Sequence, residues 1–298
     1  MTINISIAVA EGLVMAADSM SQMQSGGQVL GTHTSVEKLT EIGDVPMAAM
    51  TSGLGSIANR TIVSLIREFE FDAFGTREKA NDFRQKSVQD VAELLADFFN
   101  ARYCAEFQAG SQQTPPVLQI ILGGYSPGRF FPEVFSINFP GRVLHQTHPR
   151  PGARPGDATI TWAGVPTSLN RLILGIDLPA LGLSRDLLIT AAQPGFVPQP
   201  GAPPLPPPLP VDPVATASHY APLIQMPNNL DGMPLEEAVE FADYLGMVAI
   251  GYDRFTVGPP SVGGEFDVLA IQPEGLSWYR RKKFAAQMAA ARRGYETQ

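Results

Sequence analysis

The stretch Thr2–Asp18, which reads TINISIAVAEGLVMAAD, decides the fold. From Ile3 to Val9, isoleucine or valine alternates with small or polar residues, and this period of two is typical of a β-strand. A glutamate and a glycine then signal a turn, and the run Leu13–Ala17 that follows is compact and apolar. The segment therefore predicts a β-hairpin whose second strand ends on an acid, Asp18.

The remaining chain alternates between strand and helix patterns. Further predicted strands are Val36–Ile42, Pro46–Thr51, Val117–Leu122, Val134–Ile137, Arg142–His145, Thr159–Ala163, Phe266–Ile271 and Leu276–Tyr279. Predicted helices are Ser56–Phe71, Asn81–Phe107, Ser168–Leu174 and a long helix opened by Asp231–Pro234. This order favours an α+β fold in which two sheets pack face to face with helices on their outer faces.

Composition restricts the class of protein. With 44% hydrophobic and 17% charged residues among 298, the chain can bury a large core, and we expect a single domain over 1–298. The net charge of −8 argues against a nucleic-acid binder, and the single cysteine, Cys104, excludes an internal disulfide; we expect this thiol in the core. No apolar run reaches the length of a membrane span and no signal peptide is visible, so we expect a cytoplasmic protein.

Two regions stand apart from this core. A proline-rich insertion covers about 178–230, with ten prolines in Pro194–Pro213. Such density favours polyproline II, and we interpret it as a solvated loop rather than a ligand for an aromatic groove on a partner. A basic tail over about 280–298 is predicted to be helical, and either solvated or in contact with an acidic neighbouring subunit.

The first residues suggest a nucleophile. Because threonine is small, Met1 can be removed, and Thr2 would then carry a hydroxyl and an amine with a pKa of about 7.7–8 that can act as its base. A lysine near that amine, such as Lys38, would favour its neutral form, and Asp18 could hold the lysine in a salt bridge. Ser52-Gly53 ends a predicted strand before a helix, where backbone N–H groups can stabilise an oxyanion.

The segment Thr2–Asp18 resembles the opening of proteasome β-type subunits, whose mature chains begin with threonine, a strand, a glycine turn and an apolar run into Ala-Ala-Asp-Ser. The spacing from threonine to aspartate is the same as in that family, without a gap. Similar segments follow in the family's order along nearly the whole chain, outside the insertion and the tail. These segments are Lys38–Ile42, Ser52–Ala58, Ile120–Tyr125, Val134–Ile137, Leu235–Val239 and Gly264–Ile271.

The resemblance implies an N-terminal-nucleophile (Ntn) hydrolase with a four-layer αββα sandwich of two antiparallel sheets. It implies a role for each matching residue: Thr2 as nucleophile and base, Asp18 as buried acid, Lys38 as the lysine that tunes the amine, and Gly53 as oxyanion donor. Asp253 matches an aspartate that the family follows closely with a serine. Thr256 or Ser261 could take that place, and we favour Ser261 because two glycines follow it. No metal or organic cofactor is required.

Three positions depart from the family's pattern. Met20 stands where a basic residue is common, and the distance from Asp18 to Lys38 is about four residues longer than usual. The family's Gly-Ser-Gly near the active site is matched by Gly164-Val165-Pro166, which lacks a hydroxyl.

Our hypothesis from sequence is a threonine endopeptidase that cleaves peptide or protein substrates and self-associates into a ring-like or helical oligomer. An ATPase or adaptor partner is left open. One alternative is a hydrolase of the same mechanism that acts on a small amide. The other is a non-catalytic structural subunit, as among proteasome α-type chains; those carry an N-terminal extension that this sequence lacks, which favours catalysis.

Overall fold

The computed structural model describes residues 2–25, 28–107, 114–154, 156–175, 226 and 230–282. Most of the predicted insertion and all of the tail beyond 282 lie outside these residues. The chain divides into two compact units, one made of Met1–Val165 with Asn229–Gln298 and the other of Pro166–Asn228. A single domain with an insertion stays a prediction. In the second unit, helix α4 (Thr167–Leu169) and the π-helix η1 (Asn170–Leu174) match the short helix predicted there.

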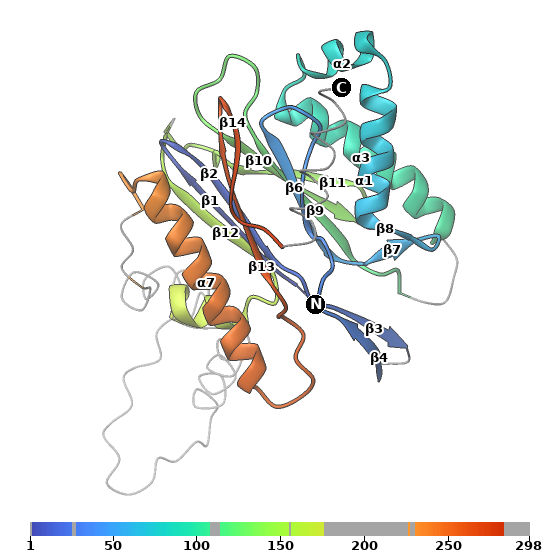
Figure 1. Cartoon of the computed structure of the whole chain (residues 1–298), viewed down its shortest axis with the longest axis vertical. Coiled ribbons are helices and arrows are strands. Elements are labelled where there is room, and N and C mark those ends of the chain that lie inside the picture. Colours follow the sequence, from blue (N-terminus) through green and yellow to red (C-terminus); the bar gives the residue numbers. More distant parts are fainter. Residues whose placement is uncertain are drawn as a thin grey trace, which may run out of the picture. The chain divides into compact units, whose positions relative to one another are not determined.

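The hairpin that decides the fold lies inside a five-stranded antiparallel sheet of order β12-β1-β2-β13-β14. Its strands are β1 (Ile3–Val9), β2 (Gly12–Asp18), β12 (Thr159–Gly164), β13 (Phe266–Gln272) and β14 (Gly275–Arg280). Helix α7 (Leu235–Phe255) packs against β1, β2 and β13 (Figure 1). Every residue of β1 and β2 is buried, because both faces of these strands are covered.

A second five-stranded antiparallel sheet has the order β11-β10-β9-β6-β5. Its strands are β5 (Leu39–Glu41), β6 (Met47–Gly53), β9 (Leu118–Gly124), β10 (Glu133–Phe139) and β11 (Val143–His148). Helices α1 (Ile62–Phe74), α2 (Arg77–Phe83) and α3 (Val88–Glu106) share a buried apolar cluster with this sheet. The expectation of an α+β fold with antiparallel sheets is confirmed.

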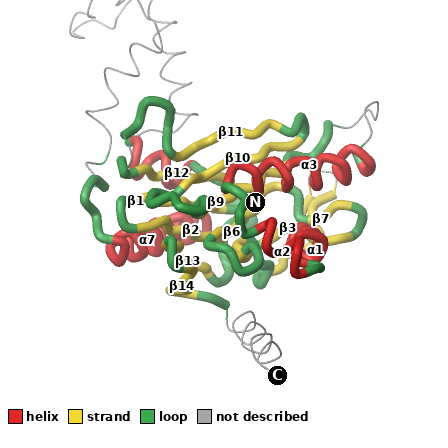
Figure 2. The backbone as a smooth tube through the Cα atoms, turned by 90° about the horizontal axis from the view of Figure 1, so that it is seen from above, coloured by secondary structure: helices red, strands yellow, loops and turns green. Residues whose placement is uncertain are grey.

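The inner faces of the two sheets form a common core. Leu13 and Met15 of β2 belong to the same buried cluster as Met50 of β6 and Ile121 of β9. In Figure 2 the strands of both sheets lie between α7 on one side and α1 and α3 on the other. The buried stripe of β2 therefore packs against the second sheet, and its alternate residues face α7.

The predicted helix Ser56–Phe71 is wrong at its start. Residues Ser56–Ile57 (β7) and Arg60–Thr61 (β8) form a small two-stranded turn instead, and α1 begins only at Ile62. The Thr61 side chain accepts a hydrogen bond from the Ser64 N–H, which satisfies a donor of the first helical turn. The N-cap sets the boundary, whereas the apolar period alone does not.

The predicted helix Asn81–Phe107 is confirmed over Val88–Glu106 and is wrong at its start, where a separate helix, α2, ends at Phe83. The N–H of Ser87 donates to the Asp90 carboxylate, and the Ser87 hydroxyl accepts from the Asp90 N–H, which forms a capping box. This box starts α3 at Val88 and separates it from α2. The sequence Ser-x-x-Asp carried that signal.

Three further differences concern the segment before Lys38, the cysteine and the basic tail. The longer connection between Asp18 and Lys38 folds into a separate hairpin of β3 (Ser21–Ser25) and β4 (Gln28–His33), which the sequence reading missed. Cys104 is exposed rather than in the core. The predicted helical tail is wrong at its start, since β14 extends to Arg280.

Among the described residues, no helix is both long and apolar enough to cross a membrane.

Candidate active site

Asp18, at the end of β2, is a fully buried carboxylate that accepts four hydrogen bonds. Its Oδ1 accepts from the Ile3 N–H at 3.0 Å and from the Lys38 ammonium at 2.8 Å. Its Oδ2 accepts from the N–H groups of Met20 at 3.2 Å and Gly263 at 3.0 Å. A buried carboxylate needs such donors to offset its lost hydration. Asp18 thereby ties together the first residues of the chain, the segment before β5 and the segment before β13.

Lys38 is only 5% exposed and forms a salt bridge with Asp18. Burial lowers the pKa of Lys38 below its usual value, since an ammonium loses hydration there; the neighbouring Asp18 carboxylate opposes this effect. The Lys38 carbonyl accepts from the Thr51 N–H at 2.9 Å, which extends the β5–β6 pairing by one residue. The lysine is therefore held at both its backbone and its ammonium.

Thr2 lies just before β1 and is only 4% exposed. Its carbonyl oxygen accepts from the Val165 N–H at 2.8 Å, and the next residue, Ile3, donates to Asp18. Gly164, with φ of +98°, lies so close that a Cβ there would stand 1.8 Å from the Thr2 oxygen. The segment Gly164–Pro166, which has no side-chain hydroxyl, thus gives Thr2 a backbone hydrogen-bond donor and packs closely against it. These bonds fix the backbone of Thr2 beside the Asp18–Lys38 pair.

Gly53 ends β6, two residues beyond the Thr51 that pairs with Lys38. Its φ is +86°, in the left-handed region that glycine adopts without strain. A Cβ at this position would lie 2.2 Å from the Val117 oxygen. The backbone can therefore take this path only with glycine.

We expect Gly53→Ala to lower the free energy of unfolding by about 2–3 kcal/mol, because the new methyl combines left-handed strain with the contact to Val117. Gly128→Ala is the matched control: φ is +71° there, and a Cβ would meet nothing within 4 Å. It should cost only the backbone strain, about 1 kcal/mol. Urea denaturation of both variants measures the difference, and equal costs would contradict the close approach at Gly53.

Asp253 and Ser261 form a direct pair, as the sequence reading favoured. The Ser261 hydroxyl donates to Asp253 Oδ1 at 2.9 Å, and the N–H groups of Ser261 and Val262 both donate to Oδ2. The other candidate, Thr256, donates its hydroxyl to the Tyr252 carbonyl. Gly263, two residues after Ser261, donates to Asp18. The pair is therefore connected to the buried acid through one short segment of chain.

The predicted site residues are joined to different degrees. Ile3, next to Thr2, and Lys38 share one oxygen of Asp18. Asp253 and Ser261 reach Asp18 through Gly263, and Gly53 reaches Lys38 through the β5–β6 pairing; no direct hydrogen bond from these three to Thr2 is found among the described residues. Met20, where a basic residue was noted as common, contributes its N–H to Asp18 and buries its side chain.

The sequence reading missed a polar patch on the inner faces of the sheets. Asn4 is fully buried, and its cross-strand neighbours Ala17 and Ala163 belong to or pack against the core shared by the sheets. Asn4 therefore faces the second sheet, two residues from Thr2. Neither atom of its side-chain amide has a hydrogen-bond partner among the described residues.

On the facing sheet, four polar side chains form a hydrogen-bonded row. Ser52 Oγ donates to Gln119 Oε1 at 3.3 Å, and Gln119 Nε2 donates to Ser136 Oγ at 3.1 Å. Ser136 Oγ also accepts from Asn138 Nδ2 at 3.1 Å. The row lies at the Gly53 end of β6, β9 and β10. Polar residues at core-facing strand positions were the sequence signal, because a strand interior normally excludes them.

Other features of the structure lie apart from these residues. A groove of about 320 Å³ between α1, α2 and α3 is lined by residues that include Phe69, Phe83 and Phe98, and it contains no predicted site residue. In the described ranges, no group of three or more His, Cys, Asp or Glu residues is arranged to hold a metal ion.

Comparison with known proteins identifies no relative. No protein-family model matches the sequence, and no curated protein matches it.

Proposed function

We propose that this chain is an N-terminal threonine hydrolase of the Ntn type, similar to proteasome β-type subunits, and that it cleaves peptide bonds through Thr2 after Met1 is removed. One observation carries the proposal: a single buried oxygen of Asp18 accepts both from the N–H beside Thr2 and from the Lys38 ammonium. A terminal amine can act as the base for its own hydroxyl, and a nearby lysine held by an acid favours the neutral form of that amine.

The arrangement of layers supports the same proposal. Two antiparallel sheets share a core, α7 packs on the outer face of one sheet, and α3 packs on the other. We therefore propose the four-layer αββα sandwich that the resemblance implies. In it, Thr2 stands at the start of an inner strand, which gives the nucleophile a rigid position.

Acylation follows from the roles of these groups. Thr2 Oγ attacks the carbonyl carbon of the scissile amide while its proton passes to the Thr2 amine. The negative charge that develops on the carbonyl oxygen is stabilised by the Gly53 N–H, an interaction worth roughly 3–4 kcal/mol at comparable sites. The C–N bond then breaks, and the leaving amine takes the proton from the Thr2 ammonium.

Deacylation uses the same groups in reverse. Water attacks the ester on Thr2 Oγ and gives a proton to the Thr2 amine, which returns it to Oγ as the acid product leaves. Lys38 keeps the amine neutral through like-charge repulsion, and Asp18 holds Lys38 in place. The Asp253–Ser261 pair fixes the segment that carries Gly263 to Asp18.

The test is covalent labelling with an electrophile that reacts with terminal threonine, read by mass spectrometry of the intact protein and its peptides. We expect the mass of a chain without Met1 and one label, on Thr2. The Thr2→Ala variant loses Met1 in the same way, because alanine is also small, but offers no hydroxyl. Label on Thr2→Ala, or a wild-type chain that keeps Met1, would refute the assignment; a retained Met1 would favour the structural-subunit alternative.

Substrate class and assembly complete the proposal. We propose peptide substrates, and a panel of fluorogenic peptides and small amides under identical conditions distinguishes this from the small-amide alternative. We also propose a cytoplasmic location and self-association into a ring-like or helical oligomer, which sedimentation velocity would detect. The polar row at Ser52–Gln119 lies close to the proposed oxyanion donor, Gly53.

A further inference from the structure

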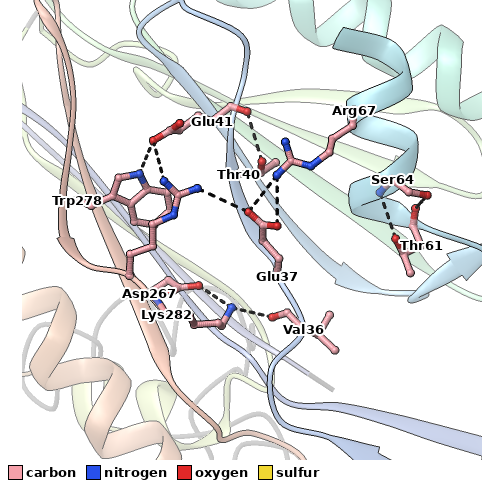
Figure 3. Close-up of polar contacts among 11 residues, drawn as sticks. Val36, Glu37, Thr40, Glu41, Thr61, Ser64, Arg67, Asp267, Trp278 and Lys282 are labelled. Carbon is pink, nitrogen blue, oxygen red and sulfur yellow. Dashed lines mark hydrogen bonds and ion pairs between the residues drawn. The ribbon is translucent and has the colours of Figure 1, made fainter. Parts of the chain in front are cut away.

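The start of the basic tail is bound to the segment that leads into β5. Trp278 donates its indole N–H to Glu41, the last residue of β5 (Figure 3). The Arg281 guanidinium forms ion pairs with Glu41 and with Glu37, which precedes β5. Arg281 lies 3.5 Å from Glu41 and 3.9 Å from Glu37, and its guanidinium stacks 4.3 Å from the Trp278 ring centre. The acidic partners of Arg281 thus lie within the same chain, whereas the predicted tail beyond 282 lies outside the described residues.

The side chain of Lys282 is more buried than those of the residues just before it in the sequence and is 6% exposed. Its ammonium lies 2.6 Å from Asp267 Oδ2 and donates to the Val36 carbonyl at 2.8 Å, while its N–H donates to Asp267 Oδ1 at 2.9 Å (Figure 3). Asp267 is 2% exposed. A buried ion pair of this kind is costly in hydration, so its presence calls for a reason other than stability alone.

This second pair adjoins the Asp18–Lys38 pair along the same elements. In the β2–β13 register, Asp267 stands opposite Ala17 and its neighbour Phe266 opposite Asp18. Val36, which binds Lys282, also donates its N–H to Ser19 at 2.9 Å and precedes Lys38 by two residues. After burial and Asp18, the ammonium of Lys282 is a further influence on Lys38, and it lowers the pKa of Lys38.

We propose that Lys282, held by Asp267 and Val36, is a positioning residue of the active site: it fixes the segment that carries Lys38 and places a second positive charge beside it. This inference rests on the proposed function for its consequence in catalysis. A second cation that disfavours charge on Lys38 also disfavours charge on the Thr2 amine, which must be neutral to act as the base.

Several charged groups lie around Lys38, and the experiment must separate the effect of Lys282 from the effects of the others. Asp18 faces it from β2, and the Lys282–Asp267 pair lies beside it from the C-terminal segment and β13. Glu37, adjacent in sequence, is paired with Arg281 and with Arg67 of α1. Substitution of Lys282 removes one positive charge from this group and leaves the other pairs in place.

The test is the pH dependence of hydrolysis by Lys282→Gln, a variant that loses the charge but keeps a donor for Val36. We expect the acidic limb of the pH–rate profile to move to higher pH by about one unit. At pH values on this limb, the rate of hydrolysis should then fall about tenfold. Lys282→Arg should restore the wild-type profile. Arg280→Gln is the matched control, because it removes the same charge two positions away, where Arg280 is 42% exposed and pairs with Asp243 of α7.

A direct measurement separates this inference from the proposed function. In a Thr2→Ala background, NMR of isotope-labelled lysine follows the titration of Lys38 without any need for activity, and Lys282→Gln should move it to higher pH. If the wild-type protein hydrolyses no peptide or amide while Lys282→Gln still moves the Lys38 titration to higher pH, the positioning of Lys38 is supported and the proposed function is refuted. An unchanged Lys38 titration, or an equal shift in Arg280→Gln, would overturn the inference.

A second variant guards against misfolding of Lys282→Gln. Asp267→Asn keeps the acceptor for the Lys282 N–H and removes the anion that offsets its ammonium. It should move the Lys38 titration in the opposite direction, to lower pH. A shift to higher pH in this variant would count against the proposal.

Discussion

Thr2→Val should lower the rate of peptide hydrolysis at least about 1,000-fold and leave the folded structure intact. Valine has the branched shape of threonine and permits removal of Met1, so the variant lacks only the hydroxyl. The bonds that hold this residue run through its carbonyl to Val165 and through Ile3 to Asp18, and none of them uses the side-chain oxygen. Initial rates on the most active fluorogenic peptide, with circular dichroism of both proteins, measure the effect.

Thr2→Ser is the matched control for this prediction. It restores a primary hydroxyl on the same backbone and should retain activity within about 30-fold of the wild type, since it loses only the methyl group that restricts the rotamer. The order wild type, serine, valine is the expected result. Substantial hydrolysis by Thr2→Val would mean that another group attacks the amide, and the N-terminal mechanism would be abandoned.

The sequence predicts the fold best where one periodicity persists over a whole element. The alternation in Ile3–Val9 and the apolar run into Asp18 specify β1 and β2 almost to the residue, because a shift of one residue would exchange the isoleucines with the small and polar side chains between the two faces of the sheet. Errors occur where a cap overrides an apolar period, as at Thr61 and Ser87. A capping side chain competes locally with helix extension, and an apolar stripe that runs through it hides the break.

The sequence reading predicts the Asp18–Lys38 salt bridge, but not the other hydrogen bonds that Asp18 accepts. Asp18 and Lys38 are separated by 20 residues in sequence, and nothing in their spacing reveals that Gly263 and Ile3 also donate to the same carboxylate. Asp267 did carry a signal, because an acid inside the apolar strand Phe266–Ile271 requires a buried partner. Its partner, Lys282, lay in a stretch interpreted as a solvated tail, where a run of cations concealed one buried member.

The buried carboxylate predicts a large effect on stability as well. Asp18→Leu should lower the free energy of unfolding by about 3–5 kcal/mol, because it strands the Lys38 ammonium, which is 5% exposed. It also leaves the N–H groups of Ile3, Met20 and Gly263 without their acceptor. Chemical denaturation followed by tryptophan fluorescence measures the loss.

Two comparisons show whether the loss comes from a stranded charge. The double variant Asp18→Leu/Lys38→Met should recover at least about 1 kcal/mol relative to Asp18→Leu, since the unpaired ammonium is then absent. Asp44→Ala breaks the exposed ion pair with Arg84 and should leave unfolding unchanged within experimental error. If the double variant were no more stable than Asp18→Leu, the loss of unfolding free energy would come from the N–H groups left without an acceptor. Asp18 would then stabilise the fold mainly through its backbone hydrogen bonds and less through its ion pair with Lys38.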